Sequence, residues 1–266
     1  MIYITGDTHR DFSRFTGKER DRLLFDLKKG DIVIVCGDFG LLWDKSSTFA
    51  FYLDWLGRLP FQILWVAGNH ENYDMLEEYN CEFWHGGKVR HIVRDKIIYL
   101  ERGQVFKLEG KKIFTFGGAS SHDVQGGILD PVDPDYAQKR IAAIQSGLPY
   151  RIKGKSWWQQ ELPTESEMQE GLENLKREKY KVDYVITHCA STRIQHELEW
   201  CYGGGSIGKL YEEDCLTDYF EQLEDMLEYK KWYCGHYHVN RIMDQKHIVL
   251  FEEIIPVEWY GAGMTE

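Results

Sequence analysis

Short polar segments rich in aspartate, asparagine and histidine recur along this chain of 266 residues, and their residue types suit the binding of metal ions. They read GDTH at 6–9, GDFG at 37–40, GNHE at 68–71, THC at 187–189 and GHYH at 235–238. Carboxylate, amide and imidazole groups together are typical ligands of first-row transition metals. One such residue alone is more often a turn or cap residue, so the prediction of a metal site depends on the repetition.

Two of these segments carry polar side chains at alternate positions. Asp7 and His9 share this spacing with His236 and His238. Residues two apart in extended backbone point to the same side, so each pair could clamp one ion or two neighbouring ions. Two metal ions roughly 3.5–4 Å apart, bridged by a carboxylate, form a clamp for phosphate oxygens.

A short apolar strand is predicted directly before each polar segment. The predicted strands are 2–5, 31–36, 62–67, 182–187 and 231–234. Because ligands of α/β sheets bind beyond the carboxyl ends of strands, polar segments that are far apart in the sequence can meet at one site.

The predicted fold is α/β, one domain over 1–266 with two mixed β-sheets packed face to face and helices outside. Helices are expected around 18–28, 46–57, 73–79, 165–179 and 217–229. Antiparallel strands joined by tight turns are expected over 91–119, and further strands near 240–244 and 247–253. Residues 120–164 show little periodicity and are interpreted as an insertion or flap with one helix near 134–146.

The composition narrows the class of partner. Hydrophobic residues make up 43% of the chain and charged residues 28%, with a formal net charge of −11 and no long basic run. A long nucleic acid is therefore not expected, whereas a site built on metal ions could still bind a phosphate. The six scattered cysteines, the absence of a signal-like N-terminus and the lack of a membrane-spanning run predict reduced thiols and a cytoplasmic location. The oligomeric state is left open.

The five polar segments, in this order, resemble the calcineurin-like metallophosphoesterases, whose pattern is GDxH, GDxx, GNH[DE], a later lone His and GHxH. The resemblance extends over most of the chain and implies a four-layer αββα sandwich with two divalent metal ions. We expect Mn, with Fe, Zn or Ni as alternatives. By this resemblance, the ligands of one ion are Asp7, His9 and His238, those of the second are Asn69, His188 and His236, and Asp38 bridges both.

The activity that the resemblance implies is hydrolysis of a phosphate ester. Two dications would lower the pKa of a bridging water, and the resulting hydroxide would attack phosphorus in line. His70 would not bind metal but would lie near the leaving-group oxygen, as a general acid or a phosphate contact. The alternatives are a phosphodiesterase or nuclease instead of a phosphomonoesterase, and a non-catalytic binding protein, which the intact ligand positions disfavour.

The chain departs from the family pattern at one position. Some phosphomonoesterases of the family carry Arg four residues after the bridging Asp, where this chain has Leu42. Arg10 could take over the phosphate contact, the alternative being a solvated arginine.

An accessory pattern is also present. GGASSHD at 117–123 and SWWQQE at 156–161 resemble segments that border the substrate cleft in a bacterial branch of the family. The residues that this resemblance assigns to the substrate are Asp123, Trp157, Trp158 and Glu161. The alternative is that both tryptophans pack the flap. The aromatic flap and the missing Arg mildly favour a diester or a nucleotide-like substrate. A glycine-rich segment, 203–210, fits a nucleotide-binding loop by its letters only, because Leu210 replaces the required Ser or Thr.

Overall fold

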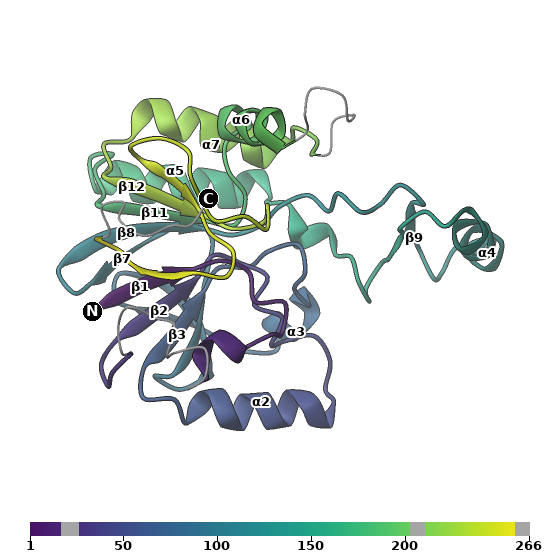
Figure 1. Ribbon diagram of the computed structural model, residues 1–266, viewed down its shortest axis with the longest axis horizontal. Helices are drawn as coiled ribbons and strands as arrows, with labels where there is room; N and C mark the ends of the chain where they lie inside the picture. Colours follow the sequence, from purple (N-terminus) through teal and green to yellow (C-terminus); the bar gives the residue numbers. More distant parts are fainter. Residues whose placement is uncertain (17–26, 203–210, 259–266) are drawn as a thin grey trace.

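Two β-sheets pack face to face, and helices cover the outer face of each (Figure 1). The structure, a computed structural model, describes residues 1–16, 27–202 and 211–258. Both sheets are mixed, with parallel strands in the middle and antiparallel pairing at the edges. The predicted α/β sandwich of two mixed sheets is confirmed.

The first sheet has seven strands in the order β15-β1-β2-β3-β6-β5-β4. Their bounds are β1 Ile2–Thr5, β2 Ile32–Val35, β3 Gln62–Trp65, β4 Cys81–Trp84, β5 Gly87–Val93, β6 Ile97–Leu100 and β15 Ile254–Pro256. β1, β2, β3 and β6 run parallel, which requires cover on both faces and explains their continuous apolar sequences.

The second sheet has six strands in the order β13-β14-β12-β11-β8-β7. Their bounds are β7 Gln104–Leu108, β8 Lys111–Phe116, β11 Tyr184–Thr187, β12 Lys231–Cys234, β13 Arg241–Ile242 and β14 His247–Val249. β8, β11, β12 and β14 pair in parallel, while β7 and β13 close the two edges in antiparallel pairing.

Helices bury the outer faces of both sheets. Next to the first sheet lie α2 (Ser47–Gly57) and α3 (Tyr73–Glu77), and next to the second lie α5 (Glu165–Arg177), α6 (Thr192–Tyr202) and α7 (Cys215–Met226). Successive strand residues point to opposite faces, so Ile34 packs between the sheets whereas Val33 and Val35 pack on the helix side. This double burial holds the strand ends in place. Single turns of 3₁₀ helix are η1 (Ser13–Phe15) and η2 (Gln159–Glu161).

Residues 120–164, which we call the arm, project from the sandwich at one end (Figure 1). The arm contains α4 (Tyr136–Ser146) and two short parallel strands, β9 (Ile128–Leu129) and β10 (Arg151–Ile152). One helix was expected within this insertion, and α4 is that helix. The paired strands tie the outgoing and returning segments of the arm together.

Several elements differ from those predicted. β5 pairs antiparallel with β6, and β7 with β8, but the chain passes from one sheet to the other between β6 and β7. β4, β15 and α6 were not predicted as separate elements. The helix expected over 18–28 falls almost entirely on residues outside the described part of the chain, as does the glycine-rich segment 203–210.

None of the described helices is both long and apolar enough to cross a lipid bilayer. All six cysteines are free thiols; Cys36, Cys189 and Cys234 are buried.

Candidate metal centre

The carboxyl ends of five parallel strands meet at one edge of the sandwich. β1, β2 and β3 lead into Asp7, Asp38 and Asn69, and β11 and β12 lead into His188 and His236. All five of these side chains are buried. The two strand groups belong to opposite sheets, so the site forms where the sheets face each other.

Asp7, His9 and His238 form the first side of the site. The Nε2 atom of His238 lies 3.2 Å from Asp7 Oδ2 and 2.8 Å from His9 Nε2. His9 Nε2 is 3.6 Å from the same carboxylate oxygen. Asp7 Oδ2 is buried and has no hydrogen-bond partner. A buried carboxylate oxygen left unpaired beside two imidazole nitrogens fits a metal ion, whose ligands these three atoms can be.

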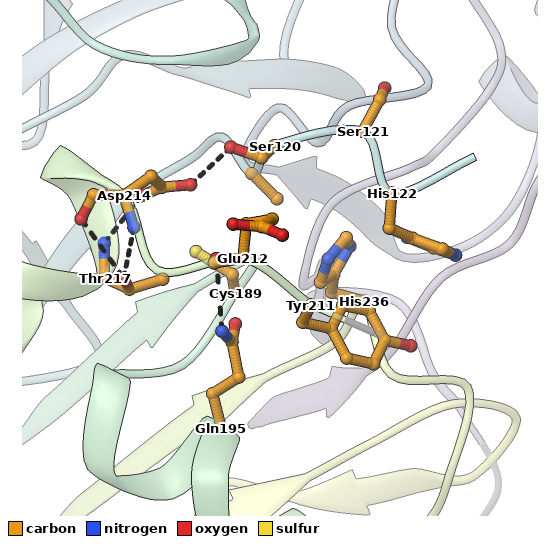
Figure 2. A pocket seen from close by; sticks show the side chains of 11 residues that line it. Ser120, Ser121, His122, Cys189, Gln195, Tyr211, Glu212, Asp214, Thr217 and His236 are labelled. Carbon is orange, nitrogen blue, oxygen red and sulfur yellow. Dashed lines mark hydrogen bonds between the residues drawn. The ribbon is translucent and has the colours of Figure 1, made fainter. Parts of the chain in front are cut away.

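His188, Asn69 and His236 form the second side. His188 Nδ1 lies 2.6 Å from the carbonyl oxygen of Cys36, which fixes the ring as an Nδ1–H donor. Its Nε2 is the nitrogen that can bind an ion once it is deprotonated, and it lies 3.2 Å from Asn69 Oδ1. The His236 ring is 5.0 Å from the His188 ring, centroid to centroid. His236 also lines a cavity of about 30 Å³, together with His122 and Tyr211 (Figure 2).

Asp38 lies between the two sides. Its Oδ1 is 3.5 Å from His188 Nε2, and its Oδ2 is 3.7 Å from His9 Nε2. The backbone N–H of His70 donates to Oδ1 at 2.7 Å, which orients the carboxylate. One oxygen of Asp38 is thus directed to each side of the site, as a bridging ligand requires.

The buried charges are strongly coupled. Burial would raise the pKa of Asp38, but the surrounding imidazoles, above all His188, hold it well below its usual value. Burial likewise opposes the charge on His188, yet the Asp38 and Asp7 carboxylates raise the pKa of His188 to about 9. Burial and His188 together lower the pKa of His236 well below its usual value. Before an ion binds His188, the proton on Nε2 must leave.

The backbone at these strand ends is left-handed, not extended. His9, Asp38, His236 and His238 have φ values of 44°, 47°, 69° and 52°, which are unusual for residues other than glycine. The expectation of an extended backbone is therefore wrong at both pairs; Asp7 and His9 still face the same side, but His236 and His238 do not. His238 faces Asp7 and His9, whereas His236 faces His188. Strain of this kind is typical of functional sites.

Glycine at 68 is required because the segment that follows β3 passes close to the candidate ligands. A Cβ atom at Gly68 would lie 2.1 Å from Asp38 Oδ1 and 2.6 Å from His188 Nε2. We expect Gly68→Ala to displace the Asp38 carboxylate, to destabilise the protein by about 1–3 kcal/mol and to lower its metal content. Thermal unfolding and metal analysis test this.

Gly57→Ala is the matched control for this substitution, because its Cβ would meet only the side chain of Val93, with Cγ1 at 3.6 Å and Cγ2 at 3.9 Å. A Gly68→Ala protein with the stability and metal content of the control would contradict the close approach.

His70 faces the outside of the ligand cluster. Its ring lies 4.9 Å from the ring of His9, and Arg151 Nη2 is 2.7 Å from its Nε2. Burial, partly opposed by the Asp38 carboxylate, lowers the pKa of His70 to about 4. A cavity of about 210 Å³ opens beside His70 and His9 and is also lined by Arg10 and Trp43. There is room for a small group next to the candidate ligands.

The residues that the accessory pattern assigned to the substrate separate into two sets. Trp157 is half-buried and, with Glu161, lines a groove of about 650 Å³ at the base of the arm. Trp158 is only 3% exposed, packs against Trp43 and donates its indole N–H to Asp74, which places it in the core and not on a substrate-facing surface.

Glu161, Asp123 and Arg10 are held by protein groups. Glu161 accepts a hydrogen bond from Ser121, and burial raises its pKa to about 8. Asp123 binds Arg151, and Arg10 binds Asp44. Three residues near the ligands were not predicted from sequence, namely Arg151, Ser121 and His122. Ser121 and His122 stand beside Asp123 in the GGASSHD segment, which was a usable signal; Arg151 had none.

Comparison with known proteins gives one family. A model of the calcineurin-like phosphoesterase family matches residues 1–240. Among solved structures, the chain is similar to the crystal structure of phosphopantetheinyl hydrolase from Mycobacterium tuberculosis, with 14% sequence identity and a TM-score of 0.44. That match covers 94% of this chain and 89% of the other. A search of curated proteins finds no match.

Proposed function

The chain belongs to the calcineurin-like phosphoesterase family, and we propose that it is a hydrolase that cleaves a phosphate ester with two divalent metal ions. The observation that carries the proposal is the buried, unpaired Asp7 Oδ2 facing His9 and His238, with Asp38 between this group and His188. A buried cluster of this kind is costly to maintain without an ion.

Each residue has a proposed part in the reaction. Asp7, His9 and His238 would hold one ion, Asn69, His188 and His236 the other, and Asp38 both. When bound, the ions would supply a hydroxide at neutral pH and neutralise charge on the phosphate.

His70 is proposed to act on the substrate without binding metal. It borders the cavity beside His9 and could reach the oxygen of the leaving group there. Its imidazole would give that oxygen a proton as the bond to phosphorus breaks.

A panel of esters tests this proposal. The purified protein, supplied with Mn²⁺, Fe²⁺, Zn²⁺ or Ni²⁺ in turn, is assayed with aryl phosphate monoesters, aryl phosphate diesters and nucleotides. We expect metal-dependent hydrolysis of at least one class, with Mn²⁺ the most effective ion. A preference for diesters would establish the phosphodiesterase alternative. Metal binding without turnover of any ester would support a non-catalytic binding protein instead.

A further inference from the structure

An arginine from the arm reaches the candidate metal centre. Arg151 is the first residue of β10 and is only 5% exposed, although Leu148 and Lys153 on either side of it are exposed. Its Nη2 lies 2.7 Å from His70 Nε2. The backbone N–H of His70 donates to Asp38. The guanidinium therefore contacts a residue that is itself hydrogen-bonded to the proposed bridging ligand.

The arm fixes the orientation of this guanidinium. Arg151 Nε donates to Asp123 Oδ1 at 2.7 Å, and Nη1 donates to the carbonyl oxygen of Ser156 at 2.9 Å. A guanidinium has five N–H groups, and the contacts with Asp123, Ser156 and His70 use at most four of them. Within the described chain, an N–H on Nη2 is therefore left for a further acceptor on the side of His70.

Arg10 also lines the cavity beside His9 and His70, but its guanidinium is already paired with a carboxylate. Its Nη1 and Nη2 lie 3.3 and 3.1 Å from the two carboxylate oxygens of Asp44, so both terminal nitrogens already donate to an anionic group. Leu42, which stands at the position where some relatives would have Arg, is fully buried. Arg151, by contrast, contacts the His70 ring directly and has an N–H left to donate to a further acceptor.

We propose that Arg151 binds the non-bridging oxygens of the substrate phosphate, so that the arm supplies the cation that Leu42 does not. This inference rests on the proposed phosphoesterase function. The unused N–H of Nη2 can donate to one phosphate oxygen, and the Nη2 N–H that contacts His70 can turn to a second oxygen when the phosphate binds. A monoester offers three such oxygens and nearly two negative charges at neutral pH, whereas a diester offers two oxygens and one charge. The substrate class that this geometry favours is therefore a phosphate monoester.

The first test measures phosphate binding, independently of turnover. Inorganic phosphate is titrated by calorimetry into the metal-loaded full-length protein and its Arg151→Gln and Arg151→Lys variants. We expect Arg151→Gln to weaken phosphate binding by about 10- to 100-fold, and Arg151→Lys to weaken it less, with unchanged metal content. Arg140→Gln, an exposed arginine on α4 of the same arm, is the matched control and should bind like wild type.

The second test compares two esters. In Arg151→Gln, kcat/KM for an aryl phosphate monoester should fall at least about tenfold more than kcat/KM for a diester with the same leaving group. Equal losses of kcat/KM for the two esters would overturn the inference that the substrate is a phosphate monoester. Unchanged phosphate affinity in both Arg151→Gln and Arg151→Lys would overturn the phosphate contact. Arg151 would then have a structural role, in holding the arm in place.

The two proposals can fail separately. If wild type hydrolyses no ester but binds phosphate through Arg151, the proposed hydrolysis is wrong and the phosphate contact stands. If Arg151→Gln does not fold, the phosphate contact is tested by Arg151→Lys alone. Its affinity for inorganic phosphate should be lower than that of Arg140→Gln, and equal affinities would overturn the contact.

Discussion

Chelation of divalent ions should abolish hydrolysis of an aryl phosphate, and Asp38→Asn should reproduce most of that loss, about 10³-fold in kcat/KM. Asp38 directs one oxygen to His9 and the other to His188 at 3.7 and 3.5 Å. An asparagine would replace one of these oxygens by an amide nitrogen, which cannot bind a metal ion, and would remove a negative charge. Two dications would then lack their common anionic ligand.

Metal content and rate should be measured together. The Asp38→Asn protein should hold fewer ions per chain at limiting metal, by elemental analysis, and adding metal should restore only part of the rate. Asp54→Asn, an exposed residue on α2, carries the same substitution away from the site and should match wild type. Wild-type turnover of Asp38→Asn at limiting metal would refute the bridging role.

The convergence of the five strand ends could be predicted because two simple signals coincide. Continuous apolar runs such as Ile32–Val35 are buried on both faces, which is typical of parallel strands, and polar residues follow each run directly. Parallel neighbours present their carboxyl ends at the same edge, so the sequence alone places Asp7, Asp38 and Asn69 near one another. No signal of this kind gives side-chain directions.

Side-chain directions at the site depend on backbone angles that sequence patterns do not encode. The i, i+2 spacing of His236 and His238 predicts parallel side chains only if the backbone is extended. Both residues are left-handed, so one histidine faces each side of the centre. The tight approach at Gly235, where a Cβ would lie 2.1 Å from Asp7 Oδ1, is part of the same turn.

The assignment of strands to sheets was only partly predictable. β6 and β7 are separated by three residues and read as neighbours in a meander, yet they belong to different sheets. Local hydrophobic patterns do not distinguish these two strands, because β6 is buried throughout and β7 is buried at every position except Lys107. Only long-range packing decides between them.

Arg151 was missed for a related reason. It lies 81 residues from His70 in sequence, within an insertion whose Gly, Pro and Asp content gives no periodicity. An arginine in such a segment is usually solvated, and only the path of the arm brings this one to the site. If Arg151 binds the substrate phosphate as proposed, the absence of an arginine at position 42 no longer favours a diester substrate.

Replacing His70 by Asn should reduce kcat by about 10²–10⁴-fold while metal content and thermal unfolding stay close to wild type. The bond from His70 to Asp38 comes from the backbone N–H, which asparagine keeps, and the side chain contacts Arg151. Atoms of His9, Asp38 and His70 nevertheless lie within 4.8 Å of one another, so metal content has to be measured. His85→Asn, in the exposed left-handed turn between β4 and β5, is the matched control.

The loss in His70→Asn should depend on the leaving group if His70 donates a proton. Burial keeps the pKa of His70 at about 4 in the free protein, so the proton must arrive with the substrate. A phosphate dianion would raise that pKa and would also draw Arg151 away from Nε2. An aryl ester with a good leaving group needs little protonation and should lose less rate than an alkyl phosphate. Equal losses on both esters would make His70 an electrostatic contact, and a parallel loss of metal would make it a ligand.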